Sequence, residues 1–314
     1  MFNDLPLLII FVCVITLLLF IDLRMIGHKQ KKMGLKQSLV WSGIWIGTAL
    51  VFMVLIYFFE DNGKLKAIDF LSAYLIEKSL SVDNLFVFLM IFDVMSIKEE
   101  KQHYILSWGI LSAIVLRLLF IFAGVTLVNL FHPILYFFGA VLFLAAYKMA
   151  FGNEKKLDLE NNFIIKFISK KYKVLSDYPE NKFFVKKDGQ TFITTSLIAL
   201  LLIESADIVF AVDSIPAVFA ITLDPFIVVT SNLFAILGLR ALYFALAGIV
   251  VLFKYLKYGV AAILAYVGFK LIAIDFIHIS NFVSLSIIVS VLFLSIVLSI
   301  ISKNQERELD KLTK

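Results

Sequence analysis

Long apolar runs alternate with short polar connections along almost the whole chain. A transmembrane helix needs about 20 mostly apolar residues, and nine segments meet that requirement. The predicted spans are 5–21, 39–59, 68–92, 105–127, 132–151, 191–215, 226–253, 259–275 and 281–301. The pattern therefore predicts an all-α polytopic membrane protein with nine transmembrane helices.

The composition agrees with this class. Hydrophobic residues make up 61% of the 314 residues and the mean hydropathy is +0.96, whereas soluble domains are about 45–50% apolar. The expected partner is thus the lipid bilayer, and the formal charge of +5 does not indicate nucleic acid. The single cysteine, Cys13, lies in an apolar run, which excludes an intrachain disulfide and a thiolate metal site.

The basic residues predict the orientation of the chain. The connections 22–38, 93–104, 152–190 and 254–258, together with the tail 302–314, hold 22 Lys and Arg residues, whereas the opposite set of connections holds Lys64 and Lys66. Because basic residues stay on the cytoplasmic side, we expect the N-terminus outside and the C-terminus inside. An odd number of spans, such as nine, also places the two termini on opposite sides of the membrane.

Three landmarks recur along the chain. Asp83 matches Asp207 at an offset of 124 residues, Arg117 matches Arg240 at 123, and Lys148 matches Lys270 at 122. Two repeated units of three helices must cross the membrane in opposite directions, which is the inverted repeat of many secondary transporters. The predicted division is two N-terminal helices (1–67), a first unit (68–151), a cytoplasmic loop (152–190), a second, inverted unit (191–275), and a last helix with a cytoplasmic tail (276–314).

The loop 152–190 is rich in lysine, and we expect it to be a solvated tether whose charges are attracted to anionic lipid headgroups. Within it, residues 183–192 place Asp188 and Gly189 between two short apolar runs. An Asp-Gly pair in this setting predicts a small β-hairpin at the membrane face.

Five carboxylates interrupt the apolar helices: Glu77, Asp83, Glu204, Asp207 and Asp213. Each would cost about 2.5–3.5 kcal/mol at the centre of a membrane helix if unpaired, and such residues mark ion pathways. Neutral oxygens from Ser81, Asn84 and Ser214 accompany them. Because Pro216 removes a backbone donor, we expect the helix to break near residues 213–214 and let these groups converge.

An all-oxygen site of this kind favours a hard divalent cation, namely Mn²⁺, Mg²⁺ or Ca²⁺. Carboxylates that do not bind the ion could carry protons in exchange for it. The alternative is that the acids pair with buried bases and only hold helices together. The bases available for such pairing are Lys78, Arg117, Lys148, Arg240 and Lys270.

Three motifs carry a resemblance to a known family: Glu77-Lys-Ser-Leu-Ser-Val-Asp-Asn-Leu-Phe-Val87, Leu202-Ile-Glu-Ser-Ala-Asp-Ile-Val-Phe-Ala-Val-Asp-Ser-Ile-Pro-Ala-Val218 and Thr230-Ser-Asn-Leu-Phe-Ala-Ile-Leu-Gly-Leu-Arg-Ala-Leu-Tyr-Phe244. They resemble the TerC/Alx family of integral membrane proteins over residues 40–300. The resemblance implies manganese export or a part in tellurium resistance. It also implies a functional role for the five carboxylates and for Asn84.

The combined expectation is an inner-membrane exporter of Mn²⁺, driven by proton antiport through a carboxylate-lined site at the midplane. The metal site would consist of Glu77, Asp83, Asn84, Glu204, Asp207 and Asp213, supported by Ser81, Ser214, Arg117, Arg240, Lys148 and Lys270. No enzymatic activity and no resident cofactor are expected. The alternative function is a non-transporting membrane scaffold, or an insertion or stress-response factor of the tellurium-resistance type.

Overall fold

A computed structural model describes residues 5–27, 34–152, 173–175, 182–187, 190–249, 255–277 and 279–312 of the protein. Its helices are α1 (Leu5–Gly27), α2 (Leu35–Phe59), α3 (Gly63–Val94), α4 (Glu99–Leu130), α5 (Ile134–Phe151), α7 (Thr195–Phe219), α8 (Pro225–Ile236), α9 (Leu239–Ile249), α10 (Leu256–Ile272) and α11 (Asn281–Leu312). Each predicted span overlaps one of these helices, and the span 226–253 is divided between α8 and α9. The all-α class is confirmed.

Within the described residues, five helical segments are long and apolar enough to cross a membrane: Leu35–Phe59, Glu99–Leu130, Ile134–Phe151, Thr195–Phe219 and Asn281–Ser302. A sixth span results if Pro225–Ile236 and Leu239–Ala247, which meet at a bend of 40°, are taken together. The chain is therefore a multi-pass membrane protein, and the number of nine spans and their orientation stay predictions.

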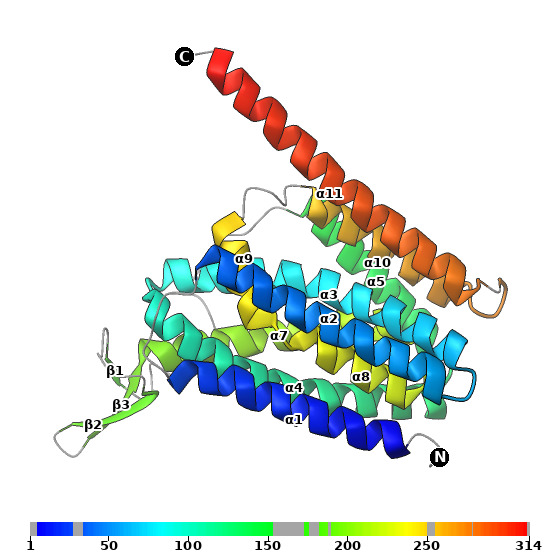
Figure 1. Cartoon of the computed structure of the whole chain (residues 1–314), viewed down its shortest axis with the longest axis horizontal. Helices are drawn as coiled ribbons and strands as arrows, with labels where there is room; N and C mark the ends of the chain where they lie inside the picture. The colour runs from blue at the N-terminus through cyan, green and yellow to red at the C-terminus, as the bar shows by residue number, and fades with distance from the viewer. Residues whose placement is uncertain are drawn as a thin grey trace.

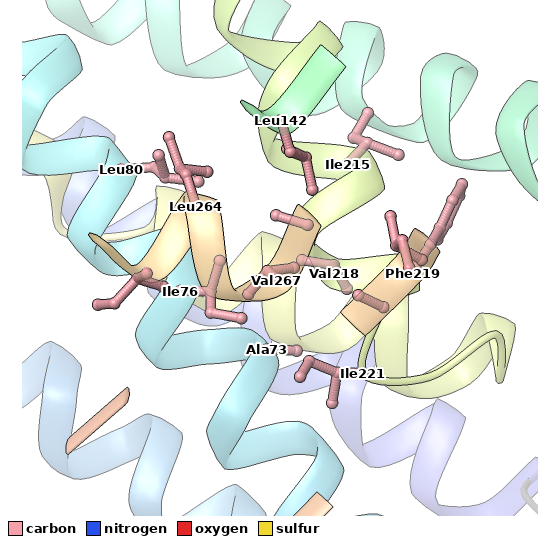
Figure 2. Close-up of a cluster of buried hydrophobic side chains, with 14 of the residues drawn as sticks. Ala73, Ile76, Leu80, Leu142, Ile215, Val218, Phe219, Ile221, Leu264 and Val267 are labelled. Atoms are coloured by element: carbon pink, nitrogen blue, oxygen red, sulfur yellow. The ribbon is translucent and has the colours of Figure 1, made fainter. Parts of the chain in front are cut away.

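The helices form one bundle with α3 at its centre, where α3 contacts α2, α7 and α8 (Figure 1). The third helices of the two predicted units, α5 and α10, pack along each other, and α11 covers α10 and continues past the bundle at its C-terminal end (Figure 1). A large apolar cluster joins α3, α7 and α10, with Ile76, Val218 and Val267 among its buried members (Figure 2). This packing brings the charged segments of α3 and α7 together.

A small sheet lies at one end of the bundle (Figure 1). Strand β2 (Phe184–Lys187) pairs antiparallel with β3 (Gln190–Thr194), with Lys187 opposite Gln190. This confirms the predicted hairpin, whose turn residues Asp188 and Gly189 lie outside the described residues. Strand β1 (Lys173–Leu175) pairs parallel with β3. The sequence did not predict this strand, because a pattern of three residues is too short.

The predicted helix break at residues 213–214 is wrong, because α7 continues through Pro216 to Phe219. The turn after the proline is held by tertiary packing, since Ala217, Val218 and Phe219 are fully buried in the apolar cluster. The broken segment is instead the next one, where α8 ends and α9 begins on either side of Leu237 and Gly238.

The bend between α8 and α9 depends on glycine. Gly238 has a φ of +78°, and a Cβ atom at this position would lie 2.5 Å from the ring of Trp45. A left-handed backbone with no room for a side chain can be occupied only by glycine at low cost. Close packing of α2 against this turn therefore fixes where the segment bends.

Candidate functional site

Arg117 on α4 lies at the centre of the buried charged groups and is 1% exposed. Its Nη1 donates to a carboxylate oxygen of Glu77 on α3, to Ser214 Oγ on α7 at 2.8 Å and to Asn232 Oδ1 on α8 at 3.2 Å. Its Nη2 lies 3.7 Å from Asp207 Oδ1 on α7. One guanidinium thus connects four helices, and its contact with Glu77 is of the kind that the alternative interpretation describes, in which the acids pair with buried bases.

The oxygens around this guanidinium are not all satisfied. Among the described residues, Glu77 Oε2, Asp207 Oδ2 and Ser81 Oγ are buried with no hydrogen-bond partner, as is Arg117 Nε. A buried polar atom left without a partner costs about 1–3 kcal/mol. These two carboxylate oxygens and one hydroxyl, on α3 and α7, are therefore available to bind a ligand, an ion or water.

Two further predicted acids lie near this group. Asp213 is half-buried and within electrostatic reach of both Glu77 and Arg117. Glu204 interacts electrostatically with Asp207, accepts a hydrogen bond from Ser112 Oγ on α4, and keeps its Oε2 unpartnered among the described residues. Four of the five predicted carboxylates thus belong to one charged group between α3, α4 and α7.

The remaining predicted metal ligands are Asp83 and Asn84. The backbone of Asp83 lies in α3, and its side chain lies outside the described part of the structure. Asn84 is buried and shares a helix face with Glu77 and Ser81, because residues four and seven apart lie close together on a helix. The face of α3 that carries Glu77 is therefore polar over at least two turns.

The basic residues of the two predicted units differ in their surroundings. Lys270 is buried and donates to Asn281 Oδ1 at 2.9 Å and to Ser284 Oγ at 3.0 Å, whereas the matching Lys148 is exposed. Arg240 is buried and donates to Ser107 Oγ at 3.3 Å. Lys148 and Lys270 therefore lie in different surroundings, and the supporting role of Lys148 stays a prediction.

Lys78 on α3 contacts the bend between α8 and α9. Its Nζ donates to the carbonyl oxygens of Ala235 at 3.1 Å and Leu237 at 3.4 Å. These carbonyls lie at the C-terminal end of α8, where a cation is favourable. Lys78 therefore stabilises the bend.

Several residues of these networks were not among the predicted site residues. Asn232 lies in the polar run Thr230-Ser-Asn232 of an otherwise apolar helix, which was the available sequence signal. Ser112 had no such signal.

A second buried network joins α3, α10 and α11. In it, Asn281 Nδ2 donates to Asp69 Oδ1 at 2.6 Å, and Asn281 Oδ1 accepts from Lys270.

The geometry around Arg117 is not that of an assembled metal centre. Within the described residues, no group of three or more His, Cys, Asp or Glu side chains is arranged to hold a metal ion. The carboxylates face the guanidinium instead. Direct coordination of an ion by these acids stays a prediction.

Comparisons with known proteins cover most of the chain. The Alx protein of Escherichia coli K12, named as a candidate membrane-bound redox modulator, is 41% identical over 296 residues, which are 92% of each chain. The membrane protein STKORF319 of Myxococcus xanthus is 43% identical over 291 residues, which are 93% of this chain and 91% of that protein. A membrane protein of Rickettsia felis is 41% identical over 296 residues, which are 94% of this chain and 98% of that protein.

No solved structure shows a significant match to the chain. The profile of the integral membrane protein TerC family matches residues 62–307, a range that contains the helices α3 to α10 and every residue of the charged group around Arg117. The protein therefore belongs to the TerC family of integral membrane proteins.

Proposed function

We propose that this protein exports a divalent metal cation, Mn²⁺ in the first place, across the inner membrane in exchange for protons. The observation that supports the proposal most directly is the convergence of acidic side chains from α3 and α7 in the interior of the helix bundle. Ionisable residues in that position are costly and mark substrate or ion pathways.

The charge and the donor atoms suit such a cargo. Glu77, Glu204, Asp207 and Asp213 together with Arg117 carry a formal charge of −3 when all are ionised. The available ligand atoms are oxygens, which Mn²⁺, Mg²⁺ and Ca²⁺ prefer. The one cysteine, Cys13, is exposed on α1, so soft metals would find no thiolate in this group.

In this proposal each of the nine predicted spans crosses the membrane, with α8 and α9 forming one of them, and the N-terminus lies outside and the C-terminus inside. The units α3–α5 and α7–α10 form an inverted repeat and move against each other around the charged group, as in other secondary transporters. The relatives named as candidate redox modulators suggest a cellular redox effect. With one cysteine per chain, we propose that such an effect follows indirectly from altered metal content.

A second function is supported by the ion pair between Arg117 and Glu77. This pair ties α3 to α4 and would equally suit a non-transporting scaffold or stress-response factor of the tellurium-resistance type. The two proposals differ in whether the protein needs a carboxylate that does not contact Arg117 directly. A scaffold needs only the pair, whereas a transporter needs the charge of Asp213 as well.

The test is Mn²⁺ transport by purified protein in proteoliposomes that contain a Mn²⁺-sensitive dye. We expect wild type to move Mn²⁺ under a proton gradient and Asp213→Asn to lose that activity with an unchanged unfolding temperature. Asp93→Asn is the matched control, because Asp93 is an exposed carboxylate at the end of α3. Export is wrong if wild type moves no Mn²⁺, and the scaffold is favoured if Asp213→Asn transports normally.

A further inference from the structure

We infer that Arg117 is a tethered cation that occupies the ion site in the unloaded protein and must withdraw before a metal ion can bind. The inference rests on the proposed function and adds that Arg117 and the metal ion compete for the same site. Its starting point is the nature of the atoms that surround the guanidinium, since they are the atoms that a hard metal ion would use.

Within the described part of the chain, each group that contacts the Arg117 guanidinium is an oxygen acceptor. They are the carboxylates of Glu77 and Asp207, the hydroxyl of Ser214 and the side-chain carbonyl of Asn232. Arginine fits such a set because its planar fork of N–H groups matches carboxylate oxygens. A divalent cation with six to eight oxygen ligands would use the same set, so guanidinium and metal compete for the same atoms.

Because the site is buried, the guanidinium and a metal ion cannot occupy it at the same time. Arg117 and Glu77 are 1% and 0% exposed, and charges repel much more strongly in such an interior than in water. A divalent ion placed among these oxygens would lie beside a fixed positive charge with no water between them. Metal binding therefore requires the guanidinium to move away from Glu77 and Asp207.

The contacts also show what the movement would release. Arg117 and Glu77 belong to the first predicted unit, whereas Asp207, Ser214 and Asn232 belong to the second. The guanidinium therefore bridges the two units while no ion is present. The contact from Nη2 to Asp207, at 3.7 Å, is longer than a hydrogen bond and is the one that gives way first. Replacement of the bridge by an ion would couple loading to the relative motion of the units.

The test uses full-length protein stripped of metal, in detergent, with Mn²⁺ as the probe. Equilibrium Mn²⁺ binding and the unfolding temperature with and without Mn²⁺ are measured for wild type, Arg117→Gln and Arg117→Lys. If the site is free of arginine about a tenth of the time, removing the arginine tightens Mn²⁺ binding about tenfold. Arg117→Gln should also unfold at a lower temperature without Mn²⁺ and regain that stability when Mn²⁺ is added.

Two further variants keep the test decisive. Lys78→Gln removes a buried cation that donates to the backbone carbonyls of Ala235 and Leu237, and Mn²⁺ should not restore its stability. Arg117→Lys keeps a positive charge without the fork, so it should fold even if Arg117→Gln does not, and should bind Mn²⁺ more tightly than wild type.

The inference is overturned if both Arg117 variants bind Mn²⁺ no more tightly than a wild type that does transport it. If neither wild type nor the variants bind Mn²⁺, the proposed function is wrong and the inference falls with it. If Mn²⁺ restores Lys78→Gln as well as Arg117→Gln, the stabilisation is not specific to the site, which also overturns the inference.

Discussion

Gly139 and Gly268 face each other where α5 crosses α10, so that neither helix could carry a larger residue there without moving. A Cβ atom at Gly139 would lie 2.9 Å from the carbonyl oxygen of Gly268, and one at Gly268 would lie 3.0 Å from the carbonyl oxygen of Gly139. Small residues let helices approach closely in membranes, where packing drives association. The two predicted units are thus joined by backbone contact between their third helices.

Gly139→Val should separate α5 from α10. The new side chain would meet Ile272 as well as the backbone of Gly268, and overpacking of this kind costs about 1–3 kcal/mol. Thermal unfolding in detergent measures the loss. Gly43→Val on α2 is the control, because a Cβ there meets no atom within 4 Å. Equal unfolding temperatures for the two variants would contradict the contact.

Glu77→Gln should destabilise the fold more than Asp207→Asn. Glu77 bonds Arg117 directly, whereas the Asp207 oxygen lies 3.7 Å from Nη2. Loss of one partner of a buried ion pair costs about 3–5 kcal/mol, and we expect a smaller loss at Asp207. The free energy of unfolding of the two variants, measured side by side in metal-free buffer, decides the order. The reverse order would mean that Asp207 holds the guanidinium.

Asn281→Ala should loosen the attachment of α11 to the bundle. The Asn281 amide links Asp69 to Lys270, and hydrogen bonds to charged groups contribute about 1.5–3 kcal/mol each. Hydrogen exchange in α11 should increase, and the unfolding temperature should fall. Ser286→Ala on the exposed side of α11 removes only a bond to its own helix and should change neither. Unchanged exchange in Asn281→Ala would show that α11 is held by apolar packing alone.

Phe183→Ala should release the small sheet from α4. The Phe183 ring lies 4.8 Å from that of Tyr104 and 6.1 Å from that of Trp108, and aromatic pairs contribute about 0.5–1.5 kcal/mol each. Limited proteolysis in the 152–190 loop should become faster while the helical bundle stays intact. Phe184→Ala is the matched control because Phe184 is exposed. Similar cleavage rates for both variants would exclude a specific anchor at Phe183.

The sequence alone determined the segments and their chemistry. Apolar runs, Asp188-Gly189 and isolated acids are local patterns, and each reflects a local physical rule: helix length against bilayer thickness, turn geometry, and the cost of charge in an apolar helix. For this reason the described helices could be predicted, with α8 and α9 expected as one span, together with the hairpin and most of the acids of the charged group. The motifs around Glu77 and Asp207 also predicted the family.

The tertiary structure decided which groups meet. Arg117 lies 40 residues from Glu77 and 115 from Asn232 in sequence, and no local pattern records that they touch. The same holds for Lys148 and Lys270, which match in the predicted repeat although Lys148 is exposed and Lys270 is buried against α11. The bend at Gly238 instead of Pro216 has the same cause. Packing against Trp45 and the apolar cluster outweighs the local preference of proline, because contacts between distant segments contribute more free energy than one backbone hydrogen bond.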